Sequence, residues 1–370
     1  MDVTMSSIVS ACILGSVMII LFCPIVTKSS VICKAGPKCI VFILMCMVMR
    51  MFFPVEPWFS YSIRLEHILP PIRRVMNYEI FWHFYAVRIW DVLMFVWAAG
   101  IVCQSGKKFS VYRKLKRVMR LLPSAGLGEF LEEKGLHELE KYKDTDIRVV
   151  VTEFAGAPCL AGIRNSTILL PENNYSREEL SYIIQHEMMH YKNKDVCKKM
   201  MLDFLCTAFW WNPAFFYLKK KLFHMIEISN DRILTKEMED EGKKAYMECL
   251  MNVAVKIRRQ EIPLEVSFNK SSVRELKQRI VLIQENAEEQ NFFRKSLFFG
   301  TLLLLWLSFF IILEPYTEAP EGAPMTAENT YLIQNGEMYD VYVDGEFFFS
   351  TDDLTPFQGV AIKKEEDKDE

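Results

Sequence analysis

The chain is poor in several features that would place it in a common soluble class. Its 44 lysine and arginine residues are balanced by 47 aspartate and glutamate residues, so the net charge is only −3 and direct nucleic-acid binding is not expected. Its ten cysteines form no Cys-x-x-Cys pair, and none falls in residues 55–79 or 314–370. Neither a disulfide framework nor a cysteine-based metal site is therefore indicated. Histidine is also scarce, with six residues, so a histidine pair at ligand spacing is informative.

Long apolar runs are present instead. Hydrophobic residues make up 51% of the sequence, and residues 7–26 contain no charged side chain over a length that crosses a bilayer core. No basic leader or small-residue cleavage site accompanies this run, so we interpret it as an anchor and not as a removed signal peptide. Further apolar runs follow at 39–54, 80–102 and 297–313. The sequence therefore predicts a mainly α membrane protein with four transmembrane helices.

The charges beside these runs predict their orientation. The largest basic cluster, residues 107–120, follows the third run, and the positive-inside rule places it in the cytoplasm. We therefore expect a multi-pass protein of the cell membrane, embedded in the lipid bilayer, with its N-terminus outside. Residues 107–296 would form a cytoplasmic domain, and residues 55–79 and 314–370 would lie outside the cytoplasm.

Arg88 and Asp91 interrupt the third apolar run at a helical i,i+3 spacing. The pair could neutralise itself within the membrane, and both a signalling role and a plain packing role remain open.

The strongest chemical signal lies in residues 182–195. Here His186, Glu187 and His190 form a His-Glu-x-x-His pattern. On a helix the two histidines lie one turn apart on the same face, so both imidazoles can bind one Zn²⁺, and Glu187 can reach a water in the open coordination position. The pattern indicates a zinc peptidase in which Glu187 is the general base.

The flanks of the motif favour a helix packed inside a domain. Residues 183–184 and 188–189 are apolar, and Ser176-x-x-Glu179 has the form of a capping box that starts a helix just ahead of the motif. The alternative is an exposed amphipathic helix that carries two histidines without binding metal.

A third ligand is expected from a second helix, and Glu227 is the candidate. Asp231 lies one turn after Glu227 on the same face. Glu227 could bind the metal while Asp231 accepts a hydrogen bond from the free ring nitrogen of a ligand histidine. The alternative for both carboxylates is an ordinary solvated helix face. His224, one turn before Glu227, is a weak candidate for an oxyanion donor, and a buried structural histidine is the preferred reading.

The remainder of the cytoplasmic domain is expected to be α+β. Residues 129–142 are helical in pattern with Gly135 as an interruption, and residues 146–153 and 168–170 are rich in β-forming residues. A strand just before the motif helix would offer an edge to which an extended peptide could add, which suits a protease.

Residues 200–218 are strongly apolar but are not expected to cross the membrane. Asp203 and the pair Asn212-Pro213 interrupt them, so we expect this segment to pack against the spans or to lie at the membrane interface. A crossing here would place Glu227 and the histidines on opposite sides of the bilayer.

The C-terminal part alternates apolar and polar residues around two turn signals, Asn335-Gly336 and Asp344-Gly345. We expect a small β meander after the fourth span, followed by a charged, disordered end at 363–370.

An ordered series of motifs resembles the BlaR/MecR sensor-transducer peptidases. The resemblance covers residues 1–313. It is carried by three apolar runs, the motif helix, a fourth apolar run, and the elements Asp195, Trp211-Asn212-Pro213, Glu227-x-x-x-Asp231, Val266-Ser267-Phe268 and Leu276-Lys277-Gln278-Arg279-Ile280.

The resemblance implies a gluzincin-like zinc metallopeptidase domain. His186, His190 and Glu227 would bind zinc, Glu187 would be the general base, and Asp231 would support a ligand histidine. It also implies that an extracytoplasmic signal activates the peptidase, which cuts itself between Glu227 and the last span. The expected substrate is a cytoplasmic winged-helix repressor of the BlaI/MecI type, and a homodimer is one assembly that this reading leaves open.

One departure from the resemblance is large. The residues after Leu313 are too few for a penicillin-binding domain. Their single serine, Ser350, is followed by Thr-Asp-Asp, so it does not begin a Ser-x-x-Lys motif. The Ser-x-x-Lys matches at 105–108 and 267–270 fall on the expected cytoplasmic side, so β-lactam sensing is not expected. Two other functions stay open: a membrane peptidase of the quality-control or prenyl-protein type, and a signalling scaffold with a structural metal.

Overall fold

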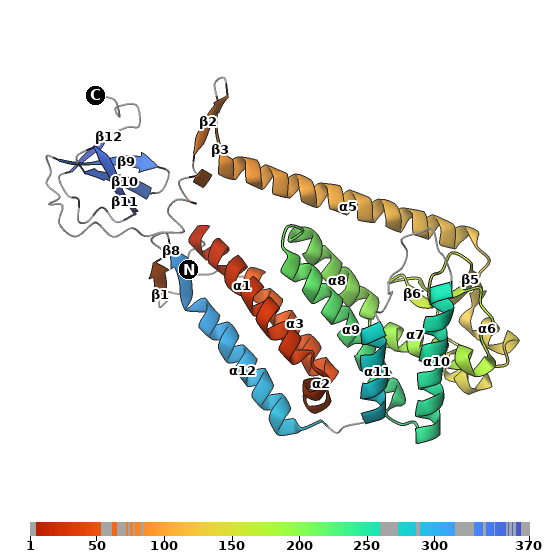
Figure 1. The fold of residues 1–370 in the computed structure, drawn as a ribbon. Coiled ribbons are helices and arrows are strands. Elements are labelled where there is room, and N and C mark those ends of the chain that lie inside the picture. Colours follow the sequence, from red (N-terminus) through yellow and green to blue (C-terminus); the bar gives the residue numbers. More distant parts are fainter. Residues whose placement is uncertain are drawn as a thin grey trace. The chain divides into compact units, whose positions relative to one another are not determined.

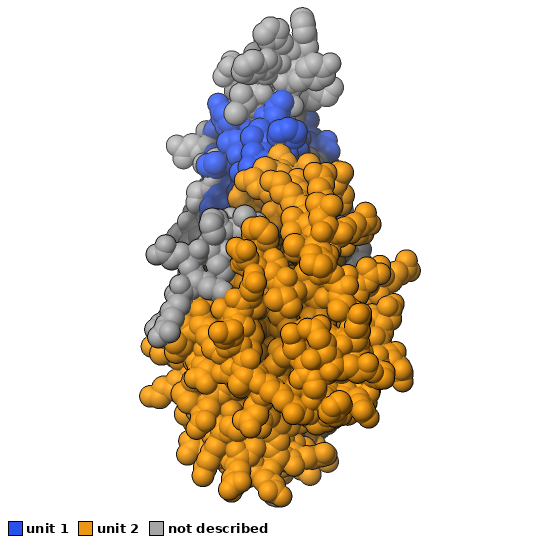
Figure 2. All heavy atoms as spheres, turned by 90° about the vertical axis from the view of Figure 1, so that its right-hand side faces the viewer, with its two compact units in different colours: residues 1–15, 50–98, 304–370 blue, residues 16–49, 99–303 orange. Residues whose placement is uncertain are grey.

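The structure is a computed structural model of the 370-residue chain. It describes residues 5–52, 61–64, 72, 75–76, 78–82, 85–259, 273–285, 289–314, 329–335, 338–343, 345–352, 354, 357 and 360–363. The chain forms two compact units, coloured separately in Figure 2. One comprises residues 1–15, 50–98 and 304–370, and the larger comprises residues 16–49 and 99–303.

The larger unit contains a four-stranded mixed sheet in the order β4-β5-β7-β6. β5 (Ile147–Thr152) and β7 (Ser166–Pro171) pair in parallel at its centre and confirm the two strands predicted from the sequence. The edges are β4 (Ala125–Gly126) and β6 (Cys159–Ala161), each antiparallel to its neighbour. Both edge strands are too short to produce a recognisable sequence pattern.

The helical segment before the sheet is interrupted where the sequence predicts. α6 (Leu127–Glu133) ends before Gly135, whose φ of +65° lies in the left-handed region, and the 3₁₀ helix η1 (His137–Tyr142) follows. Leucines of both elements join the core that the sheet forms with the next helix.

α7 (Arg177–Lys192) carries the histidine motif and begins at the predicted capping box. The Ser176 hydroxyl accepts from the Glu179 N–H at 3.1 Å, and the Glu179 carboxylate accepts from the Ser176 N–H at 2.9 Å. Ile183, Ile184 and Met188 enter the core against the sheet, so the motif helix is buried as expected.

The apolar segment 200–218 is divided between α8 (Asp195–Ala208) and α9 (Pro213–Thr235). Asn212 caps α9 through a hydrogen bond from the Ala214 N–H, and Pro213 occupies its first turn. The Asn212 side chain also donates to the Ser16 hydroxyl at 2.8 Å, and Lys108 donates to Thr207 at 2.6 Å. The segment therefore contacts α1 (Met5–Val26) and α5 (Ile89–Leu121), which agrees with the first of its two predicted arrangements, packing against the apolar helices.

Two further helices complete the bundle around the motif. α10 (Asp240–Arg259) packs against α7, while α11 (Val273–Glu285) packs against α9, α10 and α2 (Figure 1). The segment 266–268 lies in residues 260–272, outside the described residues. The expected self-cleavage region, between Glu227 and the last span, includes those residues together with α10 and α11.

Three of the described helices are long and apolar enough to span a membrane: α1 (Met5–Val26), α5 (Ile89–Leu121) and α12 (Asn291–Phe309). A fourth candidate is the pair α2 (Ser29–Ala35) and α3 (Pro37–Phe52), which are bent by 104° relative to each other. The prediction of four spans therefore corresponds to three helices and one bent pair.

Two of the expected transmembrane helices cover only part of the apolar runs that predicted them. β2 (Glu79–Trp82) and β3 (Tyr85–Arg88) are paired antiparallel strands, so the helix expected from residue 80 begins at Ile89 and continues through the basic cluster. The last apolar run leaves the helix after Phe309, because its end, β8 (Ile311–Glu314), pairs in parallel with β1 (Tyr61–Arg64). Apolar aromatic and β-branched residues occur both in membrane helices and in β-strands, so hydropathy alone does not distinguish a helix from a strand here.

The C-terminal residues form a sheet in the order β11-β10-β9-β12. β9 (Thr330–Asn335), β10 (Met338–Val343) and β11 (Glu346–Thr351) are the predicted antiparallel meander. β12 (Ala361–Lys363) pairs in parallel with β9, so Lys363 belongs to a strand and not to the expected disordered end. The rest of that expected end, 364–370, lies outside the described residues.

Candidate metal centre

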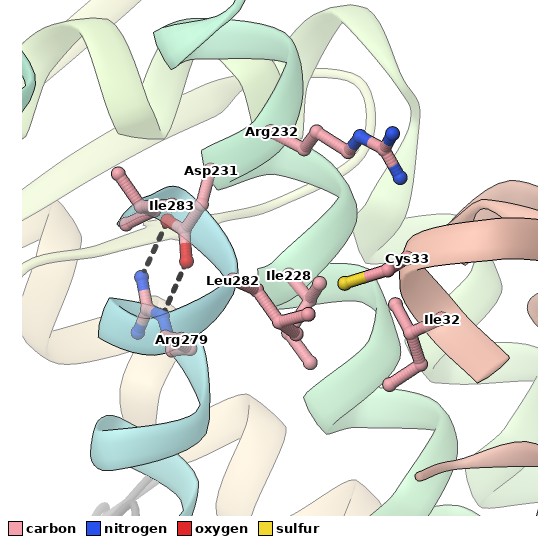
Figure 3. A pocket seen from close by; sticks show the side chains of 8 residues that line it. All are labelled: Ile32, Cys33, Ile228, Asp231, Arg232, Arg279, Leu282 and Ile283. Atoms are coloured by element: carbon pink, nitrogen blue, oxygen red, sulfur yellow. Dashed lines mark hydrogen bonds and ion pairs between the residues drawn. The ribbon is translucent and has the colours of Figure 1, made fainter. Parts of the chain in front are cut away.

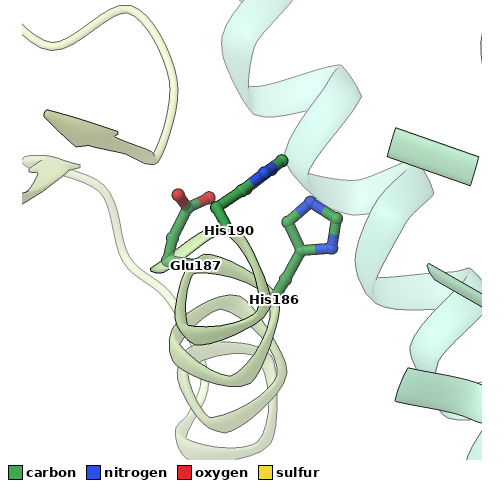
Figure 4. A group of neighbouring side chains, drawn as sticks. All are labelled: His186, Glu187 and His190. Atoms are coloured by element: carbon green, nitrogen blue, oxygen red, sulfur yellow. The ribbon is translucent and has the colours of Figure 1, made fainter. Parts of the chain in front are cut away.

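The two motif histidines lie on one face of α7 and are buried. Their rings are 5.0 Å apart between centroids, and ligand atoms of His186, Glu187 and His190 all fall within 4.8 Å of one another. Figure 4 shows the two imidazoles and the Glu187 carboxylate leaving the same side of the helix. Residues spaced by one helical turn in the sequence therefore bring their metal-binding atoms close together.

α9 brings Glu227 to the two histidines. Its Oε2 lies 3.2 Å from His186 Nε2, and its Oε1 lies 3.5 Å from His190 Nε2. Ligands of a tetrahedral zinc ion, bound at about 2.0–2.2 Å, are separated from each other by about 3.3–3.6 Å. The spacing of these three side chains therefore fits a shared zinc ion.

The other ring nitrogen of His186, Nδ1, contacts side chains of α9 and α10. His186 Nδ1 donates to the Tyr246 hydroxyl at 2.9 Å and lies 3.4 Å from Asp231 Oδ1. The Tyr246 hydroxyl in turn donates to Asp231 at 2.7 Å. These contacts hold a proton on Nδ1, so Nε2 is the nitrogen that faces Glu227 and that can bind a metal once its own proton is lost.

His190 is held in the same way by different residues. Its Nδ1 donates to Asp195 Oδ2 at 2.9 Å, and the Asn230 amide donates to the same oxygen at 2.7 Å. Asp195 is 1% exposed and begins α8, five residues after His190. Both imidazoles therefore present Nε2 to the same space, each backed by a buried carboxylate.

Glu187 differs from the other acidic side chains of the site. It is 5% exposed, and its Oε2 has no hydrogen-bond partner among the residues that the structure describes. A buried carboxylate oxygen without a partner is costly unless a water or a ligand completes it. This oxygen provides an independent sign that the site accommodates a metal with its water.

Two cations balance the carboxylates. Lys199 Nζ lies 3.1 Å from Glu227 Oε1, and Arg279 forms a bidentate ion pair with Asp231. Burial raises the pKa of both carboxyls, but Lys199 beside Glu227 and Arg279 beside Asp231 outweigh it, so both pKa values lie below their usual range. Burial lowers the pKa of His186, and the neighbouring carboxylates of Asp231 and Glu227 outweigh burial and raise it to about 9.

Comparisons with known proteins agree with this geometry. Residues 76–283 match the family described as BlaR1 peptidase M56. The chain belongs to this family. It is also 29% identical over 129 residues to the regulatory protein BlaR1 of Bacillus licheniformis, and 30% identical over 131 residues to the regulatory protein BlaR1 of Staphylococcus aureus. Each match covers 34% of this chain and 22% of the relative, so it spans about a fifth of the length of these proteins.

In this M56-family chain the metal site opens into a large cleft. The cleft has a volume of about 830 Å³, and its lining includes His186, Glu187, His190 and Glu227. The edge strand β6 and the C-terminal part of α5 line it as well. The volume is large enough to hold several residues of an extended peptide.

The structure brings together all five side chains named from the sequence, and it adds several that sequence reasoning missed. Asp195 and Arg279 were named only as parts of the motifs that carry the resemblance, without a role at the site. Tyr246 comes from α10, where no local pattern indicates it, and Asn230 could have been suspected because it follows Glu227 by three residues. His224 donates from Nε2 to the Gln278 amide oxygen at 2.9 Å, which supports its structural role.

Proposed function

We propose that the protein is an integral-membrane zinc metalloendopeptidase. The observation that carries this proposal is the approach of the Glu227 carboxylate to Nε2 of both His186 and His190, beside the buried Glu187 oxygen that has no partner among the described residues. Membership of the M56 peptidase family and the candidate membrane spans support it.

His186, His190 and Glu227 would hold the ion, with three protein ligands and one open position. Zinc bound there supplies a Lewis acid for the scissile carbonyl and lowers the pKa of a water toward neutrality. Asp231 and Asp195 would hold the proton on Nδ1 of the two ligand histidines, so that each Nε2 stays available. A closed structural site would need a fourth protein ligand instead of this opening.

Glu187 would act as the general base. Its free oxygen accepts a proton from the attacking water and then donates that proton to the nitrogen of the leaving amine. Burial keeps this carboxylate away from bulk solvent, so the proton stays within the site between the two steps.

The substrate would bind as an extended peptide along β6. β7, the strand immediately before the motif helix, is paired on both sides and has no free edge. Among the strands of the described residues β6 pairs with β7 alone, and Cys159, Leu160 and Ala161 line the cleft. The prediction that the strand just before the motif helix offers an open edge is therefore wrong. We propose that β6 offers the edge instead, where backbone hydrogen bonds can position a peptide.

The biological role follows from the family. We propose that an extracytoplasmic signal activates the peptidase, which then cuts itself and inactivates a cytoplasmic repressor of the BlaI type. The domain limits and topology inferred from the sequence belong to this proposal: peptidase domain at 107–296 in the cytoplasm, with residues 55–79 and 314–370 outside. The basic residues of 107–120 support this orientation.

Peptide mass analysis of cells that carry the Glu187→Gln variant tests the proposal. Loss of one self-fragment and of one repressor fragment, with zinc retained, is the expected result. Glu178→Gln on the exposed face of the same helix is the matched control and should cleave normally. Accumulation of many misfolded membrane proteins would favour a quality-control peptidase, and full signalling by the Glu187 variant would favour a scaffold.

A further inference from the structure

α11 contacts both the metal site and the corner where α1 ends and α2 begins. Two consecutive residues make these contacts. Arg279 points to the metal site, and Gln278 points to the corner formed by residues 27–29. A single helix therefore bridges a candidate membrane span and the metal site.

Arg279 fixes the carboxylate that supports His186. Its Nε donates to Asp231 Oδ2 at 2.6 Å and its Nη2 donates to Oδ1 at 2.7 Å, while Nη1 lies 3.9 Å from Glu227 Oε2. The arginine is 9% exposed and Asp231 is 1% exposed. A bidentate, buried pair sets the orientation of the carboxylate as well as its charge, and Asp231 sets the orientation of the His186 ring.

Gln278 fixes the position of α11 relative to the corner. Its amide nitrogen donates to the Thr27 carbonyl at 3.0 Å and to the Ser29 hydroxyl at 3.2 Å. Its amide oxygen accepts from His224 of α9 at 2.9 Å. The amide thus joins the corner, α11 and α9 through three hydrogen bonds.

Other contacts leave little freedom between α2 and α11. The Cys33 thiol donates to Glu285 at 3.0 Å, and the Gln290 N–H donates to the Lys34 carbonyl at 2.9 Å. Side chains of α2, α9 and α11 fill the space beside the Asp231–Arg279 pair (Figure 3). The cavity left there is about 10 Å³, about the size of one water-sized sphere, so a shift of α2 displaces α11 and is not absorbed by empty space.

We propose that Arg279 is a positioning residue for the metal site and that Gln278 couples it to the corner at residues 27–29. This inference rests on the proposed zinc site. A displacement of the end of α1 moves α11 through Gln278, changes the Arg279–Asp231 pair and reorients the His186 imidazole. The affinity for zinc and the rate of peptide hydrolysis thereby depend on the position of α1.

The test measures zinc affinity of the full chain in detergent micelles by competition with a fluorescent chelator. Arg279→Gln should weaken zinc binding about 10–100-fold, the usual effect of removing a partner behind a metal ligand, and Arg279→Lys should recover part of the loss. Gln278→Ala, which leaves Arg279 in place, should weaken binding about 2–30-fold. Because Gln278 acts through Arg279, the double variant should bind like Arg279→Gln alone.

Lys277→Gln is the matched control, because it removes an exposed cation from the same helix and should bind zinc like the wild type. The inference is overturned if Gln278→Ala lowers only thermal stability while its zinc affinity equals that of the wild type. It is also overturned if the loss of zinc affinity in the double variant is the product of the losses in Arg279→Gln and Gln278→Ala. Arg279→Lys and Gln278→Ala keep the test valid if Arg279→Gln does not fold. A wild-type chain that binds no zinc would instead overturn the proposed function itself.

Discussion

Asp231 is the side chain whose replacement should reveal most about the site, because side chains from α7, α10 and α11 contact its carboxylate. Arg279 donates to it twice, Tyr246 donates at 2.7 Å, and His186 Nδ1 lies 3.4 Å away. Asp231→Asn preserves the volume but leaves the buried guanidinium without its counter-charge. Removing one partner of a buried ion pair costs about 3–5 kcal/mol, a large part of the stability of a domain.

The assay is unfolding of the full chain in detergent micelles by urea, followed by tryptophan fluorescence. Asp231→Asn should lose about 3–5 kcal/mol of unfolding free energy. The double variant Asp231→Asn/Arg279→Gln should lose less than the sum of the single variants, because the uncompensated charge is gone. Asp144→Asn, at an exposed position, is the control and should stay within about 0.5 kcal/mol. A loss below about 1 kcal/mol, or strict additivity, would refute the reasoning.

Three further predictions concern other parts of the structure. Gly36→Ala should destabilise the protein by about 1–3 kcal/mol, because φ is +83° and an added Cβ would meet the Glu289 carboxylate; an unchanged melting temperature would contradict this. Ser176→Ala removes the capping box with Glu179 and should cost about 1 kcal/mol while zinc stoichiometry stays the same, as measured by unfolding and metal analysis. Zinc affinity should rise about tenfold per pH unit between pH 6 and 8 and level off above pH 9. The carboxylates beside His186 raise its pKa to about 9, so a proton competes with zinc below that pH, and a flat profile in chelator competition would argue against this site.

Local signals predicted local structure well. Ser176 and Glu179 predicted the start of α7, Gly135 the break between α6 and η1, and Asn212-Pro213 the interruption that separates α8 from α9. Each of these helix starts and breaks is determined by residues within one helical turn of each other, so the local sequence is enough to predict it.

The errors arose where distant residues decide the structure. Ile311 and Ile312 belong to the last apolar run but not to helix α12, because they pair with β1, more than two hundred residues earlier in the chain. β6 is defined by its partner β7 and not by its own three residues.

The support of the ligand histidines is equally non-local. Tyr246 meets His186 across 60 positions, and Arg279 meets Asp231 across 48. The donor set of the site could thus be proposed from spacing within two helices, whereas the groups that orient it required the structure.

The proposed site holds one zinc ion with two imidazoles and one carboxylate and keeps one coordination position open. X-ray absorption spectroscopy of the purified chain tests this most directly. The prediction is one zinc per chain, two imidazole ligands, only nitrogen and oxygen in the first shell, and loss of the signal in His186→Ala. A sulfur ligand, four protein ligands, or a spectrum unchanged by Glu227→Ala would contradict it.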